Sequence, residues 1–194
     1  MRHGTTSLSE QSKAGRFQEI ALPHLNAAYN LARWLTRNDQ DAEDVVQEAY
    51  IRAFRFFDGF HGTNGRAWLL AIVRNTTFTW LKENRNAGLT TPFDEEMHSI
   101  ADGHAAEAMD QSGNNPEAIL LREDQRQQLN QALESLPIEF REVLVLRELE
   151  DLSYKEIAEV AGIPLGTVMS RLARGRKQLE ACLRKMDQES GNGL

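Results

Sequence analysis

The sequence predicts an all-α protein in which a flexible acidic linker joins two small helical domains. Three observations support this fold class. Apolar residues recur at helical spacing in both halves of the chain, strand-like alternation is nearly absent, and one acidic stretch separates the two helical regions. The length of 194 residues suits one ordinary domain or two small ones. With 41% hydrophobic and 26% charged residues, the composition is that of a globular protein.

Three helices are expected in the first helical region, residues 16–87, after an N-terminal tail at 1–15. The earliest covers roughly Phe17 to Thr36, and the last runs from near Arg66 to about Asn84. Between them, a helix from Asp41 to Phe57 is expected to follow an N-cap at Asn38 or Asp39. Its predicted buried face contains Ala42, Val45, Val46, Ala49, Ala53, Phe54 and Phe57.

The linker is predicted at residues 88–115, which hold six acidic residues and no basic one. This stretch accounts for most of the net charge of −7 and shows no apolar period. A flexible chain of this length spans about 30 Å, so the flanking domains would be able to separate. The alternative is a long surface loop within one domain, although loops of that length are uncommon.

The second helical region, residues 116–186, precedes a C-terminal tail at 187–194. Asn115-Pro116 is a helix-start signature, and the helix it opens runs to about Ser135, before Pro137. Further on, Ser153 and Glu156 form a capping box for a short helix, Gly162 permits a sharp turn, and Pro164 begins another helix. This order predicts a helix-turn-helix.

The second helix of that motif is strongly basic. Residues 163–186 hold six basic side chains and a single acidic one, Glu180. Such a helix suits the major groove of DNA, because short polar side chains reach base edges and arginines reach guanine or phosphate. The alternative is a solvated helix face. Together with the motif in front of it, the charge favours DNA binding despite the acidic total.

Two sets of motifs resemble the extracytoplasmic-function class of bacterial sigma factors, in the sigma-70 family. Region 4 of that family is matched by Leu136-Pro137, Phe140–Leu149, Leu152–Ala158 and Gly166–Arg174. Region 2 is matched by Asp41–Ala49 and Trp68–Asn75. Met169 departs from the family, which usually has a basic residue there.

This resemblance implies an alternative sigma factor that performs no catalysis. Such a protein binds core RNA polymerase and directs promoter-specific transcription initiation. The family further implies control by an anti-sigma factor, often held at the inner membrane. The resemblance assigns polymerase binding to the Asp41–Phe57 helix, and the helical wheel places five of its side chains away from the apolar face: Asp44, Gln47, Glu48, Ile51 and Arg55.

The resemblance also assigns two promoter elements. The loop Gly59–Gly65 and the helix after it would handle the −10 element, through His61, Thr63, Asn64, Arg74, Asn75, Phe78, Lys82 and Arg85. The helix-turn-helix would handle the −35 element. Ser170, Arg171 and Arg174 are its base-edge candidates, and the other members of the predicted set are Lys155, Thr167, Arg176 and Lys177. Arg141 and Arg147 would either assist from the preceding helix or be solvated.

The sequence is also compatible with other functions. The main alternative is a helix-turn-helix regulator that acts without being a polymerase subunit; an enzyme and a protein-only adaptor are two more. No nucleophile–base arrangement or phosphate loop is apparent. A lone Cys182 and no cysteine–histidine cluster predict no disulfide, metal or cofactor. Without a signal-like N-terminus or an apolar span, we expect a cytoplasmic protein.

Overall fold

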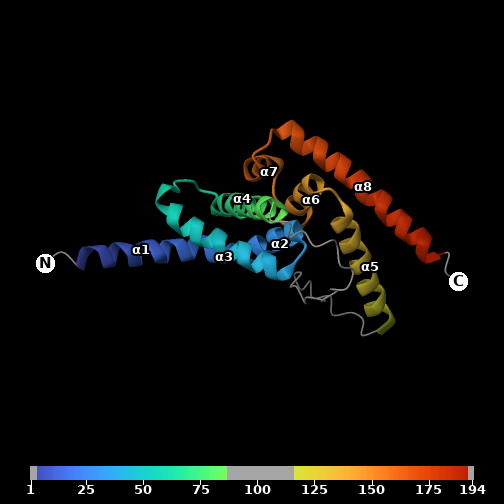
Figure 1. Ribbon diagram of the computed structural model, residues 1–194, viewed down its shortest axis with the longest axis horizontal. Coiled ribbons are helices and arrows are strands. Elements are labelled where there is room, and N and C mark those ends of the chain that lie inside the picture. Colours follow the sequence, from blue (N-terminus) through green and yellow to red (C-terminus); the bar gives the residue numbers. More distant parts are fainter. Residues whose placement is uncertain (1–3, 87–115, 192–194) are drawn as a thin grey trace.

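The computed structural model describes two helical ranges, residues 4–86 and 116–191 (Figure 1). Side chains are described within 12–84 and 125–188. The predicted linker at 88–115 lies outside the described residues. Within the described ranges every regular element is a helix or a helical turn, so the all-α prediction is confirmed. None of these helices has the length and apolar character needed to cross a membrane.

The N-terminal domain contains α1 (Gly4–Ala21), the 3-10 turn η1 (Leu22–His24), α2 (Leu25–Thr36), α3 (Asp39–Phe56), η2 (Phe57–Gly59) and α4 (Gly65–Asn86). The single helix expected from Phe17 to Thr36 is wrong, because the chain changes to a 3-10 turn around Pro23. Proline has no N–H to give to an α-helical hydrogen bond. Helix α1 also includes residues 4–15, which the sequence assigns to a tail.

Helices α2, α3 and α4 pack against one another and form the core of this domain. Asn38 caps α3, as predicted, by accepting a hydrogen bond from the Asp41 backbone N–H at 3.0 Å. The apolar face of α3 is buried except at Phe54, which is 40% exposed. Its ring instead lies edge-on to Phe17 of α1. The expectation that Phe54 is a core residue is therefore wrong.

The C-terminal domain contains α5 (Pro116–Ser135), α6 (Ile138–Leu144), the π-helical turn η3 (Val145–Leu149), α7 (Tyr154–Ala161) and α8 (Leu165–Gly191). The predicted capping box is present at the start of α7, where Ser153 and Glu156 satisfy each other's backbone N–H groups. Gly162 has a φ of 65°, the left-handed conformation that the sharp turn requires. The helix-turn-helix prediction is confirmed.

The close approach of α8 to α6 depends on another glycine. A Cβ built on Gly175 would lie 3.1 Å from the Leu144 side chain and 3.3 Å from Cβ of Phe140. This spacing allows Val168 and Leu172 of α8 to be almost fully buried. Helix α8 is therefore packed tightly against the rest of the C-terminal domain.

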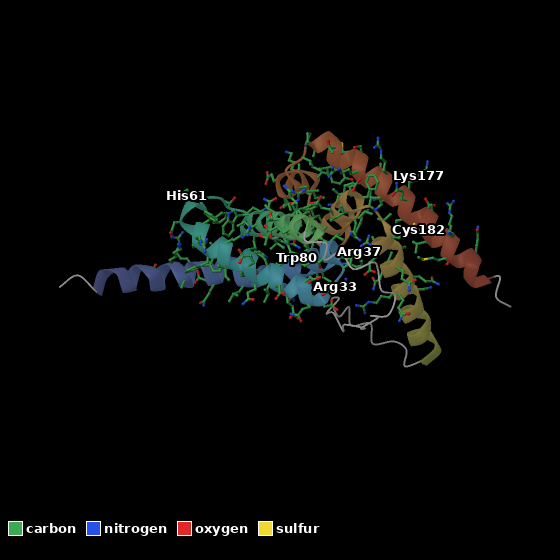
Figure 2. The ribbon with its side chains drawn as sticks, in the orientation of Figure 1. Arg33, Arg37, His61, Trp80, Lys177 and Cys182 are labelled. Carbon is green, nitrogen blue, oxygen red and sulfur yellow. The ribbon has the colours of Figure 1, made fainter. Side chains whose placement is uncertain are left out.

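The two domains lie against each other. Helix α7 packs on α4, and α6 packs on α2, while α5 and α8 extend together away from the N-terminal domain (Figure 1). In the same view, His61 and Lys177 lie on opposite sides of the molecule (Figure 2). The linker composition suggested domains that are able to separate, whereas this structure shows them in contact.

Candidate polymerase and nucleic-acid interfaces

The predicted polymerase-binding face of α3 is exposed to solvent. Asp44, Gln47, Glu48, Ile51 and Arg55 all have exposed side chains. Ile51, although aliphatic, is 49% exposed. Glu48 accepts a hydrogen bond from Arg52 at 2.7 Å, one turn further along the helix. The face therefore combines charged side chains with an apolar group that water surrounds.

Two phenylalanines near the end of α3 are also exposed. Phe54 is 40% exposed and Phe56, at the end of α3, is 65% exposed. Helical periodicity placed Phe54 in the core, and it gave no reason to single out Phe56. The signal available in the sequence was the density of aromatic residues at 54–57, which exceeds what one helix face can bury.

The glycine-rich loop lines a pocket of about 510 Å³. Its predicted members His61, Thr63 and Asn64 are exposed, and the rings of Phe60 and Trp68 lie 4.6 Å apart between centroids. Polar groups and an aromatic wall suit an unstacked base. The pocket is also lined by Glu159, which belongs to α7 of the other domain.

Asn64 makes two contacts with different consequences. Its Oδ1 accepts a hydrogen bond from the Ala67 backbone N–H at 3.0 Å, which fixes the start of α4. Its Nδ2 donates to Oε1 of Glu156, on α7, at 2.7 Å. The predicted base-reading amide is thus already bonded to a carboxylate of the C-terminal domain.

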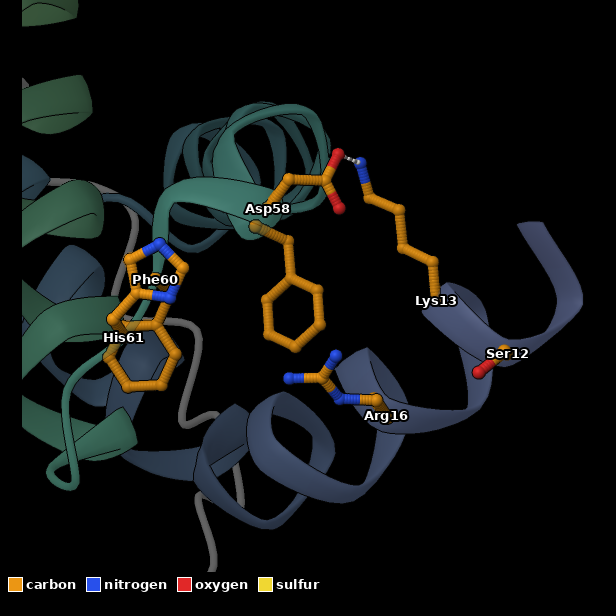
Figure 3. Close-up of a pocket in the computed structure, with 7 residues that line it drawn as sticks. Ser12, Lys13, Arg16, Asp58, Phe60 and His61 are labelled. Atoms are coloured by element: carbon orange, nitrogen blue, oxygen red, sulfur yellow. Dashed lines mark hydrogen bonds and ion pairs between the residues drawn. The ribbon is translucent and has the colours of Figure 1, made fainter. Parts of the chain in front are cut away.

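A second pocket, of about 270 Å³, lies between α1 and the turn after α3 (Figure 3). Lys13 donates to Asp58 at 2.6 Å, and the guanidinium of Arg16 lies 5.7 Å from the centroid of the Phe57 ring. Phe60 and His61 close the other side (Figure 3). No local sequence pattern indicates that α1 contributes basic groups beside the glycine loop.

On α4 the structure separates the predicted DNA-facing residues into two groups. Asn75 and Lys82 are exposed, and the side chain of Arg85 lies outside the described residues. Arg74 instead donates from Nε to Glu142 of α6 at 2.6 Å, and its guanidinium lies 4.2 Å from the centroid of the Phe78 ring. Phe78 is half-buried beneath it and packs against the core.

The basic face of α8 carries most of the predicted −35 set. Ser170, Arg174 and Lys177 are exposed, and Thr167 is half-buried and accepts a hydrogen bond from the Ser170 hydroxyl. Lys155 is exposed on α7. Arg171 is half-buried, with Nη1 at 3.9 Å from Glu142.

Arg176 differs from its neighbours on α8 because a carboxylate engages it. It pairs with Glu148 at 2.7 Å, and hydrogen bonding to that glutamate raises the pKa of Arg176. Both partners are about half exposed, so the contact is open to water and weak. A phosphate would compete readily with this carboxylate.

Two neighbouring charged residues of α6 are buried. Arg141 is 2% exposed and donates to the backbone carbonyl of Glu134; burial lowers the pKa of its guanidinium to about 10. It is neither solvated nor a DNA contact, so both expectations for Arg141 are wrong. Glu142 is fully buried, and burial raises the pKa of its carboxyl despite the nearby Arg74 and Arg171.

Cys182 is half-buried on α8, with its sulfur 3.4 Å from the Ser135 hydroxyl. Among the side chains that the structure describes, no group of three or more histidine, cysteine, aspartate and glutamate residues has metal-binding geometry. His98 and His104 of the predicted linker lie outside the described residues.

Comparison with known families matches both domains. The family model for Sigma-70 region 2 matches residues 20–87, and that for Sigma-70 region 4 matches residues 126–179. The ECF RNA polymerase sigma-E factor of Escherichia coli is 37% identical over 142 residues, which cover 72% of each protein. The chain belongs to the extracytoplasmic-function sigma factors. The ECF RNA polymerase sigma factor SigE of Mycolicibacterium smegmatis is 35% identical over 93% of this chain and 66% of the relative.

Solved structures of this family show the same arrangement of helices. The sigma factor RpoE from Bartonella quintana, crystallised with the anti-sigma factor NepR, aligns with a TM-score of 0.67 and 25% identity, over 87% of this chain and 97% of RpoE. CnrH, in complex with the cytosolic domain of CnrY, aligns with a TM-score of 0.59 and 25% identity, over 92% and 96%.

Proposed function

We propose that this sigma factor binds core RNA polymerase and directs it to a specific class of promoters. The observation that carries the proposal is the pairing of two sigma-70 regions in one chain. The first presents an exposed, partly apolar face on α3, and the second presents a basic recognition helix. A sigma factor of this kind performs no catalysis itself and works in the cytoplasm, where the polymerase is.

The division of labour between the domains follows from their surfaces. Region 2, residues 16–87, contacts polymerase through α3 and receives the opened −10 strand in the glycine-loop pocket. Region 4, residues 116–186, places α8 in the major groove at the −35 element. There Arg171 and Arg174 reach base edges, whereas Arg176 and Lys177 contact phosphates, which position the helix without specifying sequence.

Control by an anti-sigma factor is part of the proposal. The solved relatives RpoE and CnrH were captured with NepR and with the cytosolic domain of CnrY, respectively. By analogy, an anti-sigma factor holds this chain inactive. If that factor is anchored in the inner membrane, it holds the chain there as well. The exposed Ile51, Phe54 and Phe56 of α3 are apolar groups that such a partner could contact.

In vitro transcription tests this function directly. Purified chain and core polymerase are incubated with a library of randomised promoters, and the transcripts are sequenced to locate their starts. The expected result is a set of starts that requires the chain and shares −35 and −10 sequences. A chain that binds DNA specifically but neither associates with core polymerase nor generates new starts would be a helix-turn-helix regulator instead.

A further inference from the structure

Several polar pairs join the two domains, and they all run in the same direction. Acidic side chains come from the C-terminal domain and hydrogen-bond donors from the N-terminal domain. Glu142 accepts from Arg74 at 2.6 Å, Glu150 accepts from Arg66 at 2.6 Å, and Glu156 accepts from Asn64 as described above.

Two of these glutamates lie inside the interface rather than at its edge. The side chain of Glu142 is 1% exposed and that of Glu150 is 4% exposed. Glu150 accepts a second hydrogen bond, at 3.3 Å, from Asn30 of α2. A carboxylate is buried at large cost unless a cation or several donors engage it. These glutamates therefore depend on the N-terminal domain for much of their compensation.

Two of the donors that they occupy, Arg74 and Asn64, belong to the predicted −10 set. Arg66, at the start of α4, lies between them in the sequence. A fourth glutamate, Glu159, lines the glycine-loop pocket that would receive the unstacked base. Each carboxylate thus stands where a nucleic acid would place a phosphate or a base acceptor.

We propose that the free chain is self-inhibited: α6, α7 and the segment between them cover the −10 surface at α4 with carboxylates that imitate DNA, and the domains must separate before promoter DNA is bound. This inference rests on the proposed function for the identity of the ligand. It needs no anti-sigma factor, because the covering groups belong to the chain itself.

We expect core polymerase to open the chain, because the face of α3 that binds polymerase is not covered. The side chains of α3 that we assign to polymerase remain exposed in the closed arrangement. Core polymerase therefore has access to the closed chain, and binding that is compatible only with separated domains would shift the population to the open state. Only open chains bind −10 DNA, so the apparent affinity equals the affinity of the open chain multiplied by the fraction of chains that are open.

The conformational test measures the distance between the domains in the free, full-length chain. Nitroxide labels are placed at Gln18→Cys and Asp187→Cys in a Cys182→Ser background. We expect a single narrow distance distribution, which Arg66→Glu broadens and shifts. Adding Glu150→Lys to Arg66→Glu should restore part of the narrow population. Arg184→Glu, which breaks a pair within α8, is the matched control and should change nothing.

The binding test uses a single-stranded oligonucleotide carrying the −10 sequence that transcription identifies. Glu150→Gln removes one covering charge without altering α4, and Glu180→Gln removes one charge elsewhere. If nine chains in ten are closed, full opening raises the apparent affinity about tenfold. We expect tighter binding by Glu150→Gln and no change by Glu180→Gln.

The outcomes separate this inference from the proposed function. A broad distance distribution in the parent chain, or one that Arg66→Glu leaves unchanged, overturns the closed state. Equal oligonucleotide binding by parent and Glu150→Gln, with the distances of the labelled Glu150→Gln chain shifted, shows that closure does not cover the site and overturns self-inhibition. Failure of the proposed function would instead show in the absence of polymerase-dependent transcription, whatever the distances.

Discussion

The two kinds of binding surface in this chain differ in what already covers them. On α3, the predicted polymerase-binding side chains point into solvent, and Ile51 and Phe56 expose large apolar groups. On α4, Arg74 and Asn64 are each bonded to a glutamate of the other domain. The same domain therefore presents one surface that is open to its partner and another that is occupied until the domains separate.

The largest expected effect concerns the open surface. Ile51→Lys puts a charge into an apolar contact and should weaken binding to core polymerase by about 2 kcal/mol, or roughly thirtyfold. The free energy of unfolding should change by no more than about 0.5 kcal/mol, because the side chain is exposed. Titration of labelled core polymerase measures the first, and thermal unfolding the second. Gln18→Lys on α1 is the control, and full affinity in Ile51→Lys would contradict the assignment of α3.

The next effect concerns the recognition helix and applies to the reconstituted holoenzyme. Arg171→Ala or Arg174→Ala should relax the preference at particular −35 bases, since an arginine on guanine contributes about 1–3 kcal/mol of discrimination. Selection from a randomised −35 library measures this preference.

Lys177→Ala is the matched comparison on the same helix. It should weaken binding to all sequences alike and reduce the salt slope by about one, because a phosphate contact carries no sequence information. If Lys177→Ala changes the preferred bases and both arginine variants leave them intact, then α8 does not lie in the groove as proposed.

Limited proteolysis tests whether charged contacts hold the two domains together. The sequence predicts cleavage within 88–115 in the free protein. Because ion pairs and hydrogen bonds join the domains at several points, the two fragments should co-elute at low salt. At about 1 M salt, where the screening length falls to about 3 Å, they should separate. Fragments that already separate at low salt would remove the closed state from consideration.

The smallest expected effect concerns the buried carboxyl of Glu142, whose pKa is raised by burial. The folded chain then takes up a proton at higher pH than the unfolded chain does. The stability of the wild type relative to Glu142→Gln should therefore rise as pH falls from neutrality through the raised pKa, and level off below the ordinary carboxyl range. Urea unfolding across pH measures this difference, with Glu180→Gln controlling for the loss of one negative charge. A difference that does not depend on pH would contradict the raised pKa.

Local sequence patterns predicted the helices well and the contacts between distant helices poorly. The caps at Asn38 and Ser153 and the turn at Gly162 were predictable because each depends on a few neighbouring residues. The exposure of Phe54 was not, since α1 supplies its neighbour, and periodicity within one helix says nothing about that contact. The break at Pro23 was visible in the sequence but was overruled by the apolar pattern around it.

The candidate site shows the same limit. The polar face of α3 and the basic face of α8 follow from helical spacing, and the exposed members of both are where that spacing places them. The pairing of Arg74 with Glu142 joins residues 68 positions apart. Both are charged residues on helices, and nothing local indicates that one is buried against the other. Only the packing of the two domains creates that pair.

Glu142 also joins the two promoter elements through a single side chain. Its Oε1 engages Arg74, whereas its Oε2 has no hydrogen-bond partner and lies 3.9 Å from Arg171. When α4 withdraws, Arg171 becomes the nearest cation to this carboxylate. An arginine has to give up such a contact before it pairs with a base, as Arg74 does before it meets the −10 strand. One buried glutamate would thus link the release of the −10 surface to the availability of the arginine that reads the −35 element.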